Sequence, residues 1–193
     1  MTDPSGVVEP DSSVVEPVEN TLGRFVVDVA DFPEPGIVFK DITPLLADHE
    51  AFTRVVGALA AAGRDDSGAV AVDKVVGMEA RGFILAAPVA LALGIGFVPV
   101  RKAGKLPRET HAVSYSLEYG EATLEMHKDA LRPGDRVLLV DDVLATGGTV
   151  KATTELVEKA GATAVGVAVL MELSFLPGRA TVGALPLTTL MTV

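Results

Sequence analysis

Short β-branched apolar runs alternate along this chain with longer apolar stripes at helical spacing. The runs predict strands, and the stripes predict helices. Helices are expected at 48–63, 81–93 and 148–160. Strands are expected at 74–77, 97–101, 136–140 and 164–170, and 184–193 is compatible with one more strand. Two extended segments, 112–117 and 122–127, flank Glu118, Tyr119 and Gly120 and predict a β-hairpin.

This alternation of strands and helices predicts the α/β class, with a mainly parallel central sheet and helices on both faces. In such sheets, ligands bind at the carboxyl ends of the strands. We expect a single domain over 21–193. Residues 1–20, rich in acids and proline, are expected to form a disordered acidic tail. Prolines 33, 35 and 44 predict a loop with a short extended piece over 32–46.

The 19 residues from Gly82 to Val100 carry no charge, which approaches the length needed to span a membrane. Two prolines and two glycines interrupt the stretch, and Arg81 and Arg101 flank it. We therefore expect a buried helix, a glycine turn and a short strand, with no membrane partner.

The formal net charge of −10 argues against a nucleic-acid partner, because nucleic-acid binders usually carry a basic excess. The chain has no cysteine, which excludes disulfides and thiolate metal sites and suits a cytoplasmic location without establishing it. The N-terminus shows no secretion signal. The three histidines lack metal-ligand spacing.

Five basic residues and no acidic residue lie between Ala80 and Arg108. In an acidic protein, such a stretch can receive a small polyanion or can be an ordinary solvated face, and charge alone gives the two readings similar weight. The five are Arg81, Arg101, Lys102, Lys105 and Arg108.

The strongest motif is VLLVDDVLATGGT, residues 137–149. A buried strand leads into Asp141 and Asp142, and a loop with two glycines then precedes a helix. Glycines let a backbone approach an anion, and the helix N-terminus adds N–H groups and positive potential. The run is neither a P-loop nor a dinucleotide fingerprint. A plain strand–turn–helix rarely needs two acids, two glycines and two threonines together, so we favour a phosphate site.

This run resembles the motif with which type I phosphoribosyltransferases bind 5-phosphoribosyl-1-pyrophosphate (PRPP). The resemblance implies the type I phosphoribosyltransferase fold, with a small hood and a mobile hairpin and loop. It also implies that Asp141 and Asp142 bind the ribose hydroxyls. The residues expected to hold the 5-phosphate are Ala145, Thr146, Gly147, Gly148 and Thr149.

Further segments resemble the adenine-specific members of that family, in the expected order over most of 31–179. FPEPGIVFKDITPLL (32–46) resembles the adenine-binding hood, contributed mainly by 31–46. GMEARGF (77–83) and VRKAGKLPRET (100–110) resemble the pyrophosphate loop and the mobile loop. YSLEYG (115–120) resembles the catalytic hairpin.

The resemblance implies roles for single residues, and each has an ordinary alternative. The Phe39 ring would stack on adenine while the backbone of Val38 and Lys40 reads the base edge; the alternative for Phe39 is plain core. The family often has Arg at the position of Lys40, and only a main-chain contact would survive that change. Glu118 would be the catalytic acid or base, with Tyr119 shielding the site; the alternative is a solvated hairpin tip.

The leaving pyrophosphate would be bound by a separate set of residues. A non-proline cis peptide bond at Glu79–Ala80 is suggested as well, a feature that a sequence does not show. The loop 103–114 would close over the site to exclude water. The pyrophosphate-binding set is Glu79, Ala80, Arg81, Arg101, Lys102 and Lys105.

The implied reaction joins adenine to the ribose of PRPP, giving AMP and pyrophosphate in purine salvage. Mg²⁺ would be the cofactor, held by PRPP and water and not directly by protein side chains. A homodimer is expected from the resemblance. Two alternatives stay open. One is a phosphoribosyltransferase for xanthine or hypoxanthine; the resemblance of 32–46 to an adenine-binding hood argues against it. The other is a non-catalytic regulator that senses PRPP. Such a regulator would need a DNA-binding module, and the residues before the hood are too few to form one.

Overall fold

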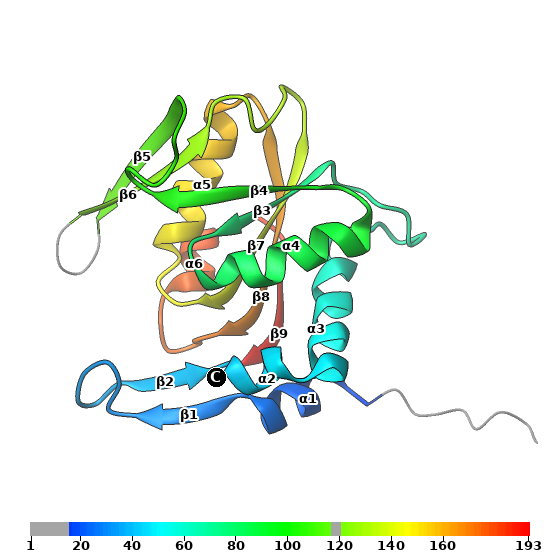
Figure 1. Ribbon diagram of the computed structural model, residues 1–193, viewed down its shortest axis with the longest axis vertical. Helices are drawn as coiled ribbons and strands as arrows, with labels where there is room; N and C mark the ends of the chain where they lie inside the picture. The colour runs from blue at the N-terminus through cyan, green and yellow to red at the C-terminus, as the bar shows by residue number, and fades with distance from the viewer. Residues whose placement is uncertain (1–15, 117–120) are drawn as a thin grey trace, which may run out of the picture.

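The computed structural model describes residues 16–116 and 121–193 (Figure 1). Residues 1–15 of the tail predicted over 1–20 lie outside the described residues, as do the candidate residues Glu118 and Tyr119. A seven-stranded sheet has the order β5-β6-β4-β3-β7-β8-β9. Its strands are β3 (Lys74–Met78), β4 (Gly96–Lys102), β5 (Thr110–Ser116), β6 (Glu121–His127), β7 (Arg136–Leu144), β8 (Thr163–Glu172) and β9 (Leu187–Thr192).

Strands β4, β3, β7, β8 and β9 run parallel to one another. The hairpin β5–β6 joins antiparallel at the edge, through β6 and β4. The prediction of a mainly parallel sheet is therefore confirmed, and the predicted hairpin forms the edge of that same sheet. The carboxyl end of β3 lies beside the middle of β7, next to the start of the aspartate pair, because Val76 pairs with Leu139 and Gly77 with Val140.

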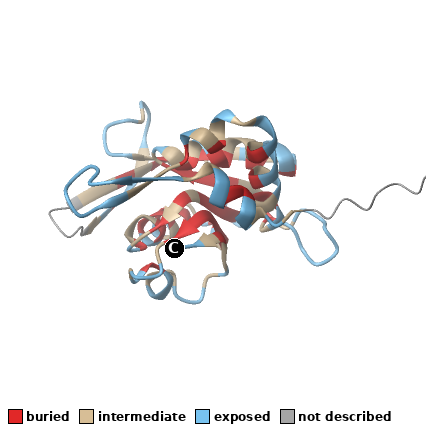
Figure 2. Cartoon of the chain, turned by 90° about the horizontal axis from the view of Figure 1, so that it is seen from below, coloured by how far each residue is buried: buried red, intermediate tan, exposed pale blue. Residues whose placement is uncertain are grey.

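Helices cover both faces of the sheet, as expected for this class. On one face, α1 (Val18–Phe25), α3 (His49–Ala61) and α4 (Arg81–Leu93) share an apolar cluster with the strands. On the other face, α5 (Gly148–Lys159) belongs to a second cluster, with α6 (Gly178–Val182) beside it. Buried positions concentrate in the sheet and on the inward sides of the helices (Figure 2).

The uncharged stretch 82–100 forms the predicted helix, turn and strand. Helix α4 buries Leu85, Val89 and Leu93 and ends at Gly94, whose φ of 70° suits a glycine. Strand β4 follows with Val98 and Val100 buried. Within the described part of the chain, no helix combines the length and apolarity needed to cross a membrane.

The hood is a separate small unit at the lower edge of Figure 1. Strands β1 (Val27–Ala30) and β2 (Val38–Asp41) pair as an antiparallel ribbon, and the short helix α2 (Thr43–Ala47) follows. Side chains alternate along β2. Phe39 and Asp41 line one hollow of the ribbon, and Val38 and Lys40 line another.

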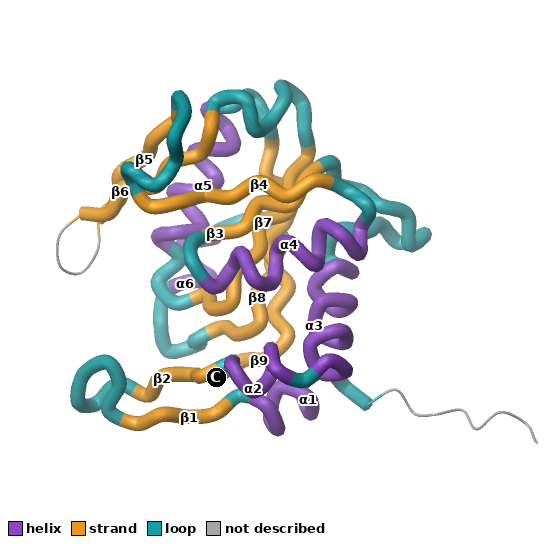
Figure 3. Tube along the Cα trace, viewed as in Figure 1, coloured by secondary structure: helices purple, strands orange, loops and turns teal. Residues whose placement is uncertain are grey.

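The structure differs from the predicted elements at several places, which can be followed in Figure 3. Helix α1 begins at Val18, so residues 18–20 were wrongly assigned to the tail; the helix is held by Leu22, which is fully buried. Strand β1 was not expected. Strand β5 begins at Thr110, which shortens the loop expected at 103–114. Strand β7 continues through both aspartates to Leu144, because β8 pairs with it as far as Glu172.

Candidate active site

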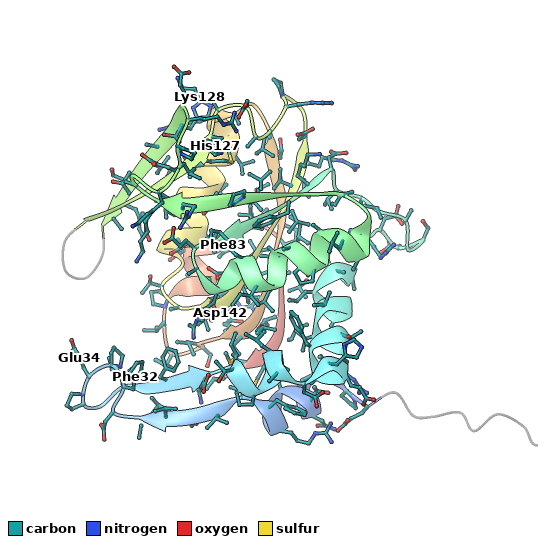
Figure 4. All side chains as sticks on the ribbon, in the orientation of Figure 1. Phe32, Glu34, Phe83, His127, Lys128 and Asp142 are labelled. Carbon is teal, nitrogen blue, oxygen red and sulfur yellow. The ribbon has the colours of Figure 1, made fainter. Side chains whose placement is uncertain are left out.

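The two neighbouring strands β3 and β7 bring Arg81 and Asp142 together. Strand β3 ends at Met78, and α4 begins at Arg81 after a cis peptide bond between Glu79 and Ala80. Arg81 Nη2 lies 2.7 Å from Asp142 Oδ2, without the alignment of a hydrogen bond. Asp142 is only 6% exposed, so this ion pair compensates a carboxylate largely withdrawn from water. In Figure 4, Asp142 lies between helix α4 and the hood.

Asp141 lies against the first turn of α4. Its Oδ1 accepts a hydrogen bond of 2.9 Å from the backbone N–H of Asp142. A Cβ at Gly82 would come within 2.8 Å of the same oxygen, so the absence of a side chain at Gly82 permits this approach. Burial, together with the charge of Asp142, raises the pKa of Asp141 well above its ordinary value. Asp141 and Asp142 thus concentrate negative charge at a half-buried position.

The glycine loop after β7 leads into α5 as the motif predicted. Gly147 is the N-cap, with a φ of 83°, a left-handed conformation that favours glycine. The first N–H groups of a helix have no partner within it, so those of Gly148 and Thr149 point out of the helix N-terminus. Such an N-terminus attracts anions through its N–H groups and the helix dipole. The aspartate pair and a helix N-terminus that attracts anions therefore lie next to each other along the chain.

The expected pyrophosphate residues lie together around Glu79. Its Oε2 accepts hydrogen bonds from Arg101 Nε at 3.1 Å and from the backbone N–H of Lys102 at 3.0 Å. Arg101 Nη1 also donates to the backbone oxygen of Lys105 at 3.2 Å. Glu79 therefore holds the start of the basic loop against the end of β3. It also offsets part of the positive charge of Arg101.

The hood presents an aromatic pocket toward the same place. A hollow of ≈ 350 Å³ is lined by Val29, Phe32, Phe39 and Asp41. The two phenylalanine rings meet edge to face, with centroids 5.2 Å apart. The Arg81 guanidinium lies over the Phe39 ring, with Cζ 4.8 Å from the centroid. Phe39 is therefore not a core residue.

The side chain of Lys40 points away from this pocket. Its Nζ pairs with Asp28 Oδ1 across the ribbon at 2.7 Å. Only its backbone remains available to a base stacked on Phe39. This arrangement agrees with a main-chain role and leaves the side chain without one in base binding.

Several residues near these groups were missed from the sequence. Asp41 shares the aromatic pocket; the Thr43 backbone N–H and hydroxyl, with the charge of Arg81, lower its pKa. Tyr115 contacts the first turn of α5, where its hydroxyl lies 3.3 Å from Thr149 Oγ1. Gly178 touches the glycine loop. Tyr115 is the first residue of the quoted hairpin motif, so a signal for it existed, whereas Gly178 and its short helix carried none.

Comparison with known proteins agrees with this geometry. A family model described as "Phosphoribosyl transferase domain" matches residues 45–176. The chain belongs to the phosphoribosyltransferase family.

Within that family, the chain is similar to several adenine phosphoribosyltransferases. The one from Nocardioides sp. is 74% identical over 168 residues, covering 87% of this chain and 91% of that protein. The one from Streptomyces coelicolor is 55% identical and covers 100% of both. The adenine phosphoribosyltransferase of Saccharomyces cerevisiae, solved in complex with adenine and an imino-altritol bisphosphate, matches with a TM-score of 0.85 and 40% identity. That match covers 90% of this chain and 98% of the yeast chain. The predicted family and fold are confirmed.

Proposed function

We propose that this protein transfers the 5-phosphoribosyl group of PRPP to adenine, forming AMP and releasing pyrophosphate. The observation that carries the proposal is the position of Arg81. Its guanidinium contacts both the Phe39 ring and the Asp142 carboxylate, at 4.8 Å and 2.7 Å. A base platform and a sugar-binding carboxylate therefore face one common space, as a reaction between a base and a ribose requires. The adenine bound in the yeast relative supports the choice of base.

In this proposal, PRPP lies along the carboxyl edge of the sheet. The 5-phosphate binds the loop Ala145–Thr149 at the N-terminus of α5, and Asp141 and Asp142 accept hydrogen bonds from the ribose hydroxyls. Breaking the anomeric C–O bond places positive charge on the ribose and negative charge on the departing pyrophosphate. The carboxylates of Asp141 and Asp142 stabilise the positive charge on the ribose. The pyrophosphate is stabilised by Arg81, Arg101, Lys102 and Lys105, next to Glu79 and Ala80.

Adenine stacks on Phe39, with its edge against the backbone of Val38 and Lys40. The base must displace the Arg81 guanidinium from the face of Phe39, and the pyrophosphate of PRPP offers that guanidinium a new partner. Glu118 handles the proton on the purine, and Tyr119 shields the site from water. These two roles rest on the family resemblance.

Magnesium fits the charge at this site. Asp142 Oδ2 is buried and, among the described residues, accepts no aligned hydrogen bond, while Asp141 carries a raised pKa. Both facts indicate negative charge that a cation would compensate. The ion would be held mainly by PRPP oxygens and water, with the two aspartates beside it. When bound, it neutralises charge on the pyrophosphate.

The proposal includes a homodimer and a cytoplasmic location. The dimer rests on the resemblance, and the location rests on a cysteine-free composition that suits a reducing compartment. Light scattering on a size-exclusion column tests the dimer. The expected mass is twice the 20.0 kDa of the chain, and a single chain mass at working concentration would contradict it.

The activity is tested by PRPP-dependent pyrophosphate release with adenine, hypoxanthine, guanine, xanthine and orotate, each with and without Mg²⁺. Adenine should exceed the other bases in kcat/KM by about 100-fold or more, the discrimination that hydrogen bonds to a base edge can supply. A preference for xanthine or hypoxanthine would favour the other purine enzyme. Binding of PRPP without turnover on any base would favour the regulator.

A further inference from the structure

Helix α6 lies directly against the glycine loop. A Cβ at Gly147 would come within 2.7 Å of the Thr181 Cβ and 2.9 Å of the Gly178 carbonyl oxygen. A Cβ at Gly178 would overlap the carbonyl oxygen of Ala145 and come within 2.8 Å of Leu144. The backbones of loop and helix are therefore in contact. Glycine on each side makes that contact possible.

An ion pair with the end of β8 holds α6 in this position. Arg179 Nε donates to Glu172 Oε1 at 2.8 Å, and Arg179 Nη2 pairs with Glu172 Oε2. Glu172 is 5% exposed and stands between Leu144 of β7 and Thr192 of β9 in the sheet. A bidentate ion pair with a buried carboxylate fixes the orientation of the Arg179 side chain as well as its distance from Glu172.

The helix needs this support because it is short. Five residues form little more than one turn, and an isolated helix of that length is not stable in water. Within this turn, the Thr181 hydroxyl donates a hydrogen bond to the backbone oxygen of Pro177 at 3.1 Å. Val182 packs on the apolar cluster around α5, and the contact with the loop and the ion pair to Glu172 add to the placement of α6. Release of Arg179 therefore weakens the support behind the loop.

We infer that α6 positions the phosphate-binding loop, with Arg179 and Glu172 as positioning residues and Gly147 and Gly178 as the point of contact. The inference rests on the proposed role of the loop in holding the 5-phosphate of PRPP. Neither Arg179 nor Glu172 touches PRPP in this arrangement. Helix α6 also lies beyond residues 45–176, the part that the family model matches.

The test compares Arg179→Ala, Glu172→Gln and Gly178→Ala with the parent protein in initial-rate assays with Mg²⁺. Each variant should raise the KM for PRPP between about 10-fold and 100-fold, the range that follows from displacing a binding group by a fraction of an ångström to an ångström. The KM for adenine at saturating PRPP should change less than about threefold, because adenine is proposed to stack on Phe39 of the hood, whereas Arg179 and Gly178 contact Glu172 and the glycine loop. Arg179→Lys should recover part of the loss.

Two designs separate positioning from mere stability. Val55→Ala in α3 removes packing from a fully buried position on the other face of the sheet. It lowers the urea midpoint without contact to the loop, and its KM for PRPP should equal that of the parent. The double variant Glu172→Gln/Arg179→Ala should raise this KM no further than Arg179→Ala alone, because the two residues act as one unit.

A KM for PRPP that is unchanged in Arg179→Ala and Gly178→Ala, or that changes only as it does in Val55→Ala, overturns the inference. If Arg179→Ala does not fold, Gly178→Ala and Arg179→Lys, which keep the pair or its charge, decide the question by the same criterion. A parent protein that forms no AMP contradicts the proposed function itself. That outcome is distinct from an active parent whose α6 variants behave normally.

Discussion

The hydroxyl of Tyr115 lies 3.3 Å from the hydroxyl of Thr149. Tyr115 belongs to β5, whereas Thr149 belongs to the first turn of α5. The same ring lies against Gly148, where a Cβ would come within 3.0 Å of it. Tyr115 stands three residues before Glu118 in the sequence. One side chain therefore links the strand before the proposed acid or base to the turn proposed to hold the phosphate.

Tyr115→Phe should raise the KM for PRPP about fivefold, because one hydrogen bond contributes about 1 kcal/mol. The ring stays in place, so stability and the KM for adenine should change little. Ser114→Ala is the matched control, since this neighbour bonds Thr123 Oγ1 across the hairpin at 2.7 Å. Steady-state kinetics with varied PRPP measures both. Equal effects from the two variants would show that Tyr115 only stabilises the hairpin.

The parts of the site that are local in sequence could be predicted. The bounds of α4 were predicted at 81–93 and are observed there, because an uncharged apolar stripe ends at Gly94. The loop between β7 and α5 was also predicted, since acids, glycines and threonines follow one another within a few residues. In both cases, the residues that decide the structure are neighbours along the chain.

The parts that depend on distant contacts could not be predicted from pattern. All four residues of β1 are exposed, so the strand has no buried face and no alternation to detect. Helix α6 is short and has no side-chain N-cap. The contact between Arg81 and Phe39 joins residues 42 positions apart and exists only because the hood folds toward the sheet. Family resemblance, and not periodicity, placed Phe39 in the site.

Phe39→Ala should raise the KM for adenine by about 10-fold to 100-fold, because stacking of a base on an aromatic ring contributes about 1–3 kcal/mol. The KM for PRPP should change much less. Ile37→Ala is the control, because Ile37 is exposed and lines the other hollow of the hood. Initial rates with each substrate varied in turn measure both constants. Equal losses for adenine and PRPP would instead assign Phe39 a role in holding the hood together.

Glu118→Gln should lower kcat about 100-fold or more, the usual contribution of a positioned acid or base, while the KM for PRPP stays within about threefold. Glu109→Gln is the control, an exposed carboxylate just before the same hairpin. Single-turnover kinetics at saturating substrates separates chemistry from product release. A change confined to the KM for PRPP would contradict the proton-handling role.

Asp141→Asn should stabilise the protein near neutral pH while abolishing productive PRPP binding. Burial and the charge of Asp142 raise the pKa of Asp141 in the folded state above the ordinary 3.8. Between pH 3.8 and the raised pKa of the folded state, the folded protein binds more protons than the unfolded chain. This carboxyl therefore lowers the stability of the fold as the pH rises through that range. Asparagine carries no charge, and its Oδ1 can still accept the Asp142 N–H.

The expected gain at pH 7 is about 1 kcal/mol, typical of relieving an unfavourable group at a functional site. It should shrink as the pH falls from the raised pKa of the folded state toward 3.8, because the native carboxyl takes up its proton over that range. Asp41→Asn should change stability in the opposite direction. Hydrogen bonds from Thr43 lower the pKa of Asp41, so its charge stabilises the fold above pH 3.8. The variant should therefore be less stable than the parent at pH 7. Urea unfolding of both variants from pH 5 to pH 8 measures this contrast. A loss of stability in Asp141→Asn at pH 7 would mean that Arg81 and the local hydrogen bonds already compensate the buried charge, and that no free energy is stored there for PRPP and magnesium to recover.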